Sequence, residues 1–142
     1  LAHKRIHEHE FLTLHFGAGP IKQVEADIIT EYPILSEYYQ IPTAALKLLD
    51  GLARLAIGTT VTRTVEYHVR THHSEGEANL FLHPNNKPQR INHLLTNFHL
   101  PKSTLLMLVA SFVGLEQSKK IYTEAIERKY RFFSYGDAML IL

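Results

Sequence analysis

Short blocks of apolar residues, separated by turn residues, recur along the chain and predict its secondary structure. Strands are expected at residues 11–16, 52–57, 80–82, 91–95 and 138–142. Helices are expected at residues 43–49, from about residue 101 to Gly114, and at residues 116–130. Because strands and helices alternate, the expected fold class is α/β.

Some stretches of this pattern carry more detail. The segment Phe11–Phe16 has apolar groups on both faces, which predicts a largely buried strand. Thr43 is expected to cap the helix that follows it. The secondary structure of residues Val61–Tyr67 is ambiguous, because β-branched side chains favour a strand whereas Thr60 could cap a helix. Irregular or loop segments are expected at residues 33–42, 71–79 and 84–90.

Residues 116–130 have the clearest amphipathic helix pattern. The apolar side chains expected on one face are Ile121, Tyr122, Ala125 and Ile126. The oppositely charged i,i+4 pairs expected on the polar side are Glu116/Lys120 and Glu124/Arg128.

The composition is that of an ordinary globular protein, and residues 1–142 are expected to form one domain. The 15 basic and 14 acidic residues give a net charge of +1, so a contact with nucleic acid must use a local basic cluster or residues outside this chain. The absence of cysteine excludes disulfides and thiolate chemistry and fits a cytoplasmic location. No apolar run approaches the ~20 residues that span a membrane. The chain does not begin with methionine, which indicates a fragment.

The ten histidines do not form a metal motif. His7-Glu8-His9 lacks the HExxH spacing, and His72, His73 and His83 lie in expected polar loops without a convergent carboxylate. No bound metal is therefore expected.

The stretch from Leu95 to Ser103 is the first candidate site, because it joins an expected strand end to an expected helix start. His99 could act as an acid or base near neutral pH, and Asn97 could orient a carbonyl or hydroxyl group. The alternative is structural: Asn97 and Ser103 cap the chain, and His99 completes a buried hydrogen-bond network.

Two glycine turns are candidate ligand cradles. Gly58-Thr59-Thr60 could hold a carboxylate or phosphate with backbone N–H groups and hydroxyls, and Arg63 could pair with the same anion. An ordinary tight turn is the alternative, since no nucleotide-binding fingerprint is present. The turn with Gly17 and Gly19 would let the backbone approach a ligand.

The tail from Tyr130 to Asp137 is the third candidate. Its aromatic side chains, together with Arg131 and Asp137, could stack a nucleobase and hold its edge. The alternative is a hydrophobic plug in front of the last strand.

Long motifs in this chain resemble the S-adenosylmethionine:tRNA ribosyltransferase-isomerase family of queuosine biosynthesis. The resemblance rests on Leu94–Val109 and Tyr130–Ile141, supported by the glycine turns after Phe11 and Ile57, in matching order over essentially the whole chain. It implies the C-terminal part of a larger α/β catalytic domain, with the β-barrel domain of the family absent. The sequence departs from the family pattern at Pro20-Ile21, Tyr32–Leu35 and Val61-Thr62.

The resemblance also implies a reaction. The family transfers and isomerises the ribosyl moiety of S-adenosylmethionine onto 7-aminomethyl-7-deazaguanine in tRNA, giving epoxyqueuosine-tRNA, adenine and methionine. S-adenosylmethionine is then the co-substrate, tRNA the partner, and a monomer the expected state of a complete protein. A catalytically inactive tRNA-binding or scaffold module is the alternative.

The candidate residues take roles in this implied reaction. His99 and Asn97 are assigned to catalysis. Those assigned to the donor are Gly17, Gly19, Gly58, Thr59, Thr60 and Arg63. Those assigned to tRNA are Lys102, Arg131, Phe132, Tyr135 and Asp137.

Overall fold

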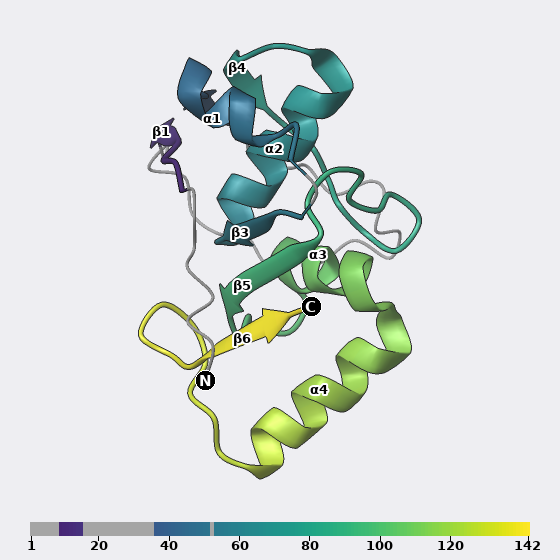
Figure 1. Cartoon of the computed structure of the whole chain (residues 1–142). Helices are drawn as coiled ribbons and strands as arrows, with labels where there is room; N and C mark the ends of the chain where they lie inside the picture. The colour runs from purple at the N-terminus through teal and green to yellow at the C-terminus, as the bar shows by residue number, and fades with distance from the viewer. Residues whose placement is uncertain (1–8, 16–35, 52) are drawn as a thin grey trace.

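The fold of the chain is given by a computed structural model, which describes residues 9–15, 36–51 and 53–142. These residues form two small sheets and four helices (Figure 1). The first sheet is antiparallel, with strand order β1-β2-β4. Its strands are β1 (Thr13–His15), β2 (Glu37–Gln40) and β4 (Glu75–Ala78).

The second sheet has strand order β3-β5-β6 and carries the candidate residues. Its strands are β3 (Leu55–Ile57), β5 (His93–Asn97) and β6 (Ala138–Ile141). Strand β3 is parallel to β5, whereas β6 is antiparallel to β5. The α/β class expected from the sequence is confirmed, with one parallel strand pair and otherwise antiparallel pairing among the described strands.

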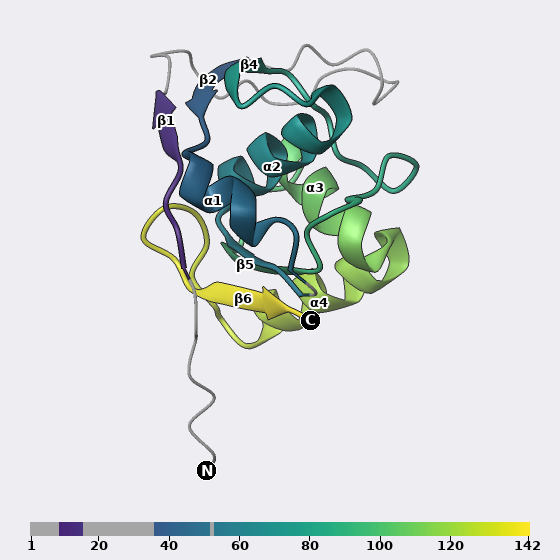
Figure 2. The same cartoon turned by 45° about the horizontal axis from the view of Figure 1, so that its top comes forward.

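The helices are α1 (Thr43–Leu48), α2 (Thr59–Thr71), α3 (Thr104–Val113) and α4 (Leu115–Glu127). Helix α2 lies between the two sheets and contacts β3, β4 and β5 (Figures 1 and 2). None of the helices in the described ranges is both long and apolar enough to cross a membrane.

The main core lies on one face of the β3-β5-β6 sheet. Buried side chains of β5 and β6, Leu94 and Ile141, pack there with Val65 of α2 and with Leu108 and Val109 of α3. The opposite face of the same sheet is open, because alternate residues of a strand point to opposite sides. The exposed apolar side chains of β3, β6 and the residue after β6 are Leu55, Ile57, Leu140 and Leu142.

Helix α3 follows from local signals in the sequence. Ser103 is its N-cap, and the Ser103 hydroxyl oxygen accepts a hydrogen bond from the Leu106 N–H at 3.2 Å. Gly114, with φ of 82°, ends α3 and starts α4. The prediction of a helix from about residue 101 to Gly114 is confirmed, and so is the capping role of Ser103.

The segment Val61–Tyr67, which the sequence left ambiguous, belongs to helix α2. Gly58 is the N-cap of α2, and both Thr59 and Thr60 lie in the first turn, so Thr60 is not the cap. A similar one-residue difference applies to α1, whose N-cap is Pro42 rather than Thr43.

Several strand predictions were wrong. Segment 33–42 was expected to be irregular, but residues Glu37–Gln40 form the central strand β2, in which buried Tyr39 alternates with exposed Tyr38. Residues 80–82 are not a strand, whereas the polar segment Glu75–Ala78 is one, because it pairs with β2. Tertiary pairing overrides the weak β-propensity of glutamate and glycine here.

The burial expected for the first strand was also wrong. Strand β1 covers only Thr13–His15, where Thr13 and His15 are exposed, and Phe11 before it is 78% exposed. One face of an antiparallel sheet commonly meets solvent, and Thr13 and His15 lie on that face. Strand β3 is shorter than expected and β5 begins two residues later than predicted.

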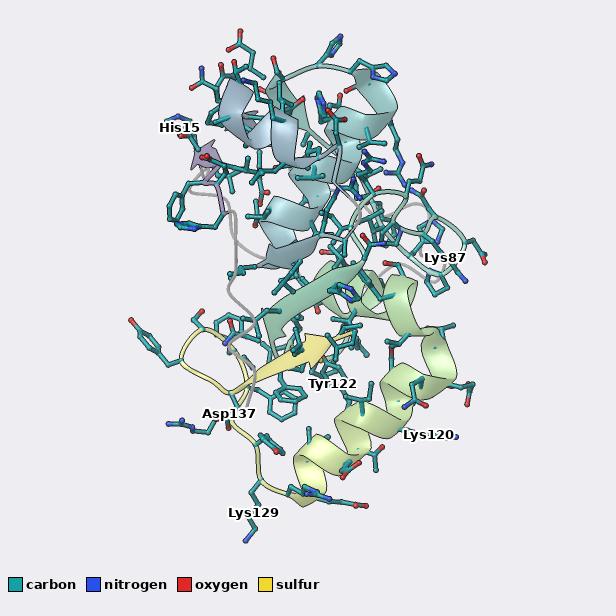
Figure 3. All side chains as sticks on the ribbon, in the orientation of Figure 1. His15, Lys87, Lys120, Tyr122, Lys129 and Asp137 are labelled. Carbon is teal, nitrogen blue, oxygen red and sulfur yellow. The ribbon has the colours of Figure 1, made fainter. Side chains whose placement is uncertain are left out.

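Helix α4 confirms its predicted charge pattern in part. Glu124 and Arg128 form the expected i,i+4 pair at 2.7 Å, whereas Glu116 pairs with Lys119 at 3.0 Å and not with Lys120. Of its apolar face, Ala125 is buried but Ile126 is exposed. Tyr122 lies on the side of α4 that faces the sheet, and Lys120 lies on the outer side (Figure 3).

Candidate active site

The three candidate segments meet at one edge of the β3-β5-β6 sheet. Because β3 and β5 are parallel, their carboxyl ends lie at the same edge, and the Gly58 N–H donates to the Leu95 carbonyl oxygen at 2.9 Å. Strand β6 is antiparallel and starts there, with Ala138 opposite Asn97. Segments 58–60, 97–99 and 131–137 are called the candidate edge below. The loop before β6 projects at this edge (Figures 1 and 2).

His99 is a buried residue held from two sides. Its Nε2 atom lies 3.0 Å from the Thr96 hydroxyl oxygen and shares a hydrogen bond with it. The His99 backbone N–H donates to the Tyr122 hydroxyl oxygen at 3.1 Å. Burial lowers the pKa of His99 to about 4, so the imidazole is neutral at pH 7.

Tyr122 is the partner that links α4 to this edge. Its ring packs at 5.7 Å from the ring of Phe98, centre to centre, and its hydroxyl accepts the His99 N–H. Burial raises the pKa of Tyr122, and the hydrogen bond from His99 offsets part of that rise. Thr96 lies within the candidate stretch but had no role assigned from the sequence, and Tyr122 was outside the candidate segments because only helix packing brings it to His99.

Asn97 ties the end of β5 to the loop before β6. Its side-chain amide donates weakly to the Gly136 and Asp137 carbonyl oxygens, at 3.4 and 3.5 Å. In addition, the Phe98 backbone N–H donates a hydrogen bond to the Asp137 carbonyl oxygen at 3.2 Å. Asn97 therefore links two of the candidate segments.

The Gly58 turn opens the first turn of α2. Gly58 has a φ of 96°, in the region that favours glycine, and the helix it begins is 13 residues long. The first N–H groups of such a helix carry partial positive charge. Arg63 lies one turn later and points elsewhere: its guanidinium is paired with the Glu37 carboxylate of β2 at 3.5 Å. Burial lowers the pKa of Arg63, and Glu37 raises it.

The loop between α4 and β6 is closed by Asp137. The carboxylate of Asp137 accepts the Arg131 N–H at 2.7 Å, and the Asp137 N–H donates back to the Arg131 carbonyl oxygen at 2.8 Å. The hydrogen bond from the Arg131 backbone is the main cause that lowers the pKa of Asp137. Asp137 thus shapes the loop from within.

The aromatic side chains of the tail divide into two groups. Phe132 packs against Phe98 at 5.5 Å and Tyr122 at 6.0 Å between ring centres, within an aromatic cluster. Tyr135, by contrast, is 97% exposed. The hydrophobic packing posed as one alternative is found at Phe132, whereas Tyr135 is exposed and its role in stacking a base stays a prediction.

Lys102 lies on the outside of the turn before α3, next to the Ser103 cap. It is exposed and has a φ of 55°. Gly17 and Gly19 lie outside the described residues, so their expected role stays a prediction. Within the described ranges, no group of three or more His, Asp or Glu side chains is placed to hold a metal ion.

A surface hollow of about 430 Å³ lies away from the candidate edge. Side chains of α4 and Arg128 line it, among them Glu116, Lys120 and Glu124, and none of the candidate residues does so. A much smaller hollow of about 10 Å³ lies beside Arg63 and α3. Neither hollow is lined by residues of segments 58–60, 97–99 or 131–137.

Glu66 is a further buried group that the sequence did not single out. Its carboxylate is fully buried and accepts the backbone N–H groups of Gln89, Arg90 and Ile91 at 2.7, 2.7 and 2.8 Å. Arg70 donates to the same carboxylate at 2.6 Å. The i,i+4 spacing of Glu66 and Arg70 is a signal that becomes readable once residues 59–71 are assigned to a helix.

Comparison with known proteins connects this edge to a family. The model of a family described as "queuosine biosynthesis protein" matches residues 1–141. A protein of a Nitratiruptor species, named S-adenosylmethionine:tRNA ribosyltransferase-isomerase, is 63% identical over 93% of this chain and 39% of its own length. A protein of Campylobacter jejuni with the same name is 57% identical over 98% of this chain and 41% of its own length.

A solved structure extends the comparison to the fold. It is described as an S-adenosylmethionine tRNA ribosyltransferase from Thermotoga maritima, with a TM-score of 0.68 and 45% identity, over 75% of this chain and 40% of that one. The chain thus spans about 40% of the length of the proteins it matches. Since the family match covers residues 1–141, this chain belongs to the queuosine biosynthesis protein family.

Proposed function

We propose that this chain provides part of the active site of an S-adenosylmethionine:tRNA ribosyltransferase-isomerase. In the proposed reaction the ribosyl moiety of S-adenosylmethionine is transferred to 7-aminomethyl-7-deazaguanine in tRNA and isomerised to epoxyqueuosine, and adenine and methionine are released. The names of relatives that are 57–63% identical support the activity. The observation that carries the proposal is the meeting of segments 58–60, 97–99 and 131–137 at one sheet edge. Because tRNA is the substrate, the proposed location is the cytoplasm.

The Gly58 turn is proposed to bind the donor. S-adenosylmethionine carries a carboxylate on its methionine end, and N–H groups in the first turn of a helix attract such an anion. Thr59 and Thr60 would add backbone N–H groups and hydroxyls at the same place. Arg63 is proposed to act indirectly, since its pairing with Glu37 anchors α2 to β2 and so steadies the turn.

His99 is proposed to exchange a proton with the reacting groups. The sulfonium of the donor makes its 5′-carbon acidic, so a base that removes a proton there is a suitable first step. With a pKa of about 4 in the substrate-free chain, His99 is a neutral imidazole at pH 7, so it is free to accept a proton, but the same burial makes it a weaker base than an ordinary histidine. Asn97 is proposed to orient the substrate beside it.

The tRNA is proposed to approach from the side of the α4–β6 loop. Arg131 is exposed on this loop, Lys102 is exposed on the turn before α3, and both can meet phosphate groups. Tyr135 is exposed, and Asp137 holds the loop that carries it. Phe132 supports the loop through its packing on Phe98.

The test requires a full-length protein. We define the exchange protein as the Campylobacter jejuni relative in which this chain replaces the matching segment, with residues numbered as here. It should release adenine from labelled S-adenosylmethionine only when substrate tRNA is present. A folded exchange protein that binds neither substrate nor releases adenine, beside an active parent, would refute the proposed function.

His99 is tested in the same protein with a matched control. His99→Ala should lower adenine release at least ~100-fold, the lower end for general acid–base groups. Thr96→Val removes the hydroxyl that holds Nε2 but keeps the imidazole, so it should lower the rate much less. Equal losses in both variants, in step with lost stability, would show that His99 acts only in the structure.

A further inference from the structure

The loop between α4 and β6 holds one aromatic residue in an unusual backbone conformation. Phe133 has a φ of 75°, in the left-handed region that is strained for a bulky side chain. The backbone fixes it there, because the Phe133 N–H donates to the Phe98 carbonyl oxygen at 2.9 Å and the Gly136 N–H donates to the Phe133 carbonyl oxygen at 3.0 Å. The surrounding structure therefore maintains the strain.

The loop has no room to relax near Gly136. A Cβ atom at Gly136 would lie 2.5 Å from the Arg131 carbonyl oxygen and 2.6 Å from the Phe132 carbonyl carbon. The two hydrogen bonds between Arg131 and Asp137 close the same loop from its two ends. The loop is thus tightly wound and presents its side chains in defined directions.

The strained turn sends successive aromatic rings in different directions. The Phe132 ring packs in the cluster with Phe98 and Tyr122, whereas Phe133 is 47% exposed and Tyr135 is 97% exposed. An exposed ring adds little hydrophobic stabilisation to the fold. Backbone strain that keeps rings in solvent points to binding, since strained residues persist mainly at functional sites.

The charges of the loop indicate the chemistry of the partner. Residues 128–137 carry three cations and one carboxylate, but Arg128 is paired with Glu124 of α4 at 2.7 Å, so Lys129 and Arg131 are the cations of the loop itself. The carboxylate, Asp137, is engaged by the Arg131 N–H at 2.7 Å and by the Arg131 guanidinium at 3.4 Å. Lys129 extends away from the body of the molecule (Figure 3). Exposed rings beside exposed cations suit a partner that offers both flat π-faces and phosphates, which is single-stranded nucleic acid.

We propose that Phe133 and Tyr135 form a stacking platform for unpaired bases of the RNA substrate, with Arg131 meeting the adjacent phosphate. This inference rests on the proposed function, because it takes tRNA as the substrate. It places base stacking on Phe133 and Tyr135 and leaves Phe132 in the aromatic cluster. Unpaired bases are the part of an RNA that proteins bind by stacking on aromatic side chains.

The experiment separates stacking from simple apolar contact and from folding. In the exchange protein, the affinity for substrate tRNA is measured together with the melting temperature. Tyr135→Leu keeps an apolar side chain without a π-face and should weaken tRNA binding at least about 5-fold, the lower end for the loss of one stacked base. Tyr135→Trp should bind at least as well as the unchanged protein.

Phe133→Gly provides a readout that a purely structural residue would not give. Glycine relieves the strain at positive φ, so the melting temperature should stay the same or rise while tRNA affinity falls at least about 5-fold. The affinity of both variants for a duplex RNA of equal length should equal that of the unchanged protein, because the bases of a duplex are already stacked on one another.

The outcomes distinguish this inference from the proposed function. If the unchanged exchange protein releases adenine and Tyr135→Leu and Phe133→Gly both keep full tRNA affinity, the platform is refuted and the proposed function stands. Lost affinity that only follows a lower melting temperature would equally refute the platform. If the unchanged protein neither binds tRNA nor releases adenine, both fail together.

Discussion

Replacing Glu66 by glutamine should strongly destabilise the protein, although the two side chains have nearly the same shape. In the structure one carboxylate oxygen accepts the Arg90 and Ile91 N–H groups, and the other accepts the Gln89 N–H and the Arg70 guanidinium. An amide keeps one oxygen and turns an NH₂ group toward the other two donors. Those two donors then lose their acceptor at a carboxylate position that is itself fully buried, although Arg70 would keep its hydrogen bond to the Glu66 carbonyl oxygen.

The magnitude follows from these contacts. Each donor that loses its acceptor costs about 1–3 kcal/mol. Breaking a buried charged pair by neutralising one partner costs about 3–5 kcal/mol. We therefore expect Glu66→Gln to lower the free energy of unfolding by about 3–5 kcal/mol, a large part of the ~5–15 kcal/mol that a domain has.

The chain offers a matched control on α4. Glu124 and Arg128 have the same residue types at the same i,i+4 spacing, with a 2.7 Å contact, but both side chains are exposed. Such pairs contribute only about 0.3–0.5 kcal/mol, so Glu124→Gln should be nearly neutral. Urea unfolding followed by circular dichroism measures both variants.

Hydrogen exchange adds a local readout. In Glu66→Gln the amides of Gln89, Arg90 and Ile91 should exchange faster, whereas the amides of α4 should follow only the change in global stability. Similar losses of stability in Glu66→Gln and Glu124→Gln, or unchanged protection at residues 89–91, would refute the argument that the Glu66 carboxylate holds this segment to α2.

Further predictions concern pH, the donor site and the isolated chain. Burial lowers the pKa of His99 from its ordinary 6.5 to about 4, so the unfolded state binds more protons than the folded state between these pH values. The free energy of unfolding should therefore fall by about 3 kcal/mol as the pH drops from 6.5 to 4. His99→Gln should make this pH dependence weaker when unfolding is measured over the same range. Thr59→Val should weaken S-adenosylmethionine binding by about 1–3 kcal/mol in calorimetry and leave tRNA affinity unchanged; unaltered donor affinity would move the donor site elsewhere. The 142-residue chain alone should release little adenine, because part of a substrate site loses much of the positioning that catalysis needs, and full activity would contradict this. The same chain should self-associate through the open face of the β3-β5-β6 sheet, so Leu140→Lys should shift sedimentation toward the monomer, and an unchanged profile would exclude that face.

The candidate site was predictable to the extent that local patterns mark it. Polar residues between a strand end and a helix start drew attention to Asn97 and His99, and the structure places both at the ends of parallel strands, as in other α/β folds. The partners of His99 were not predictable. Thr96, three residues before His99, meets the imidazole, but its hydroxyl is one of several polar groups in the same short stretch. Tyr122 lies 23 residues away, and only the packing of α4 brings its hydroxyl to the His99 backbone N–H.

The same distinction separates Phe132 from Phe133. In the sequence the two phenylalanines are equivalent neighbours in an aromatic tail. The hydrogen bonds that close the loop, and the positive φ at Phe133, pack the Phe132 ring into a cluster and leave the Phe133 ring exposed. Which of them can meet a ligand is therefore a property of the folded loop and not of composition.

Local signals in the sequence by themselves determined helix α3 and the boundary between α3 and α4, but not α2. Ser103 caps α3 and Gly114 separates it from α4, because capping and positive φ depend only on residues within a few positions. Tertiary structure alone decided the antiparallel sheet, in which Glu37 pairs with Ala78, 41 positions away. It also decided the burial of Glu66, which needs residues 89–91 as partners. Strand pairing and buried polar networks are satisfied by groups that are distant in sequence, so no local pattern can specify them.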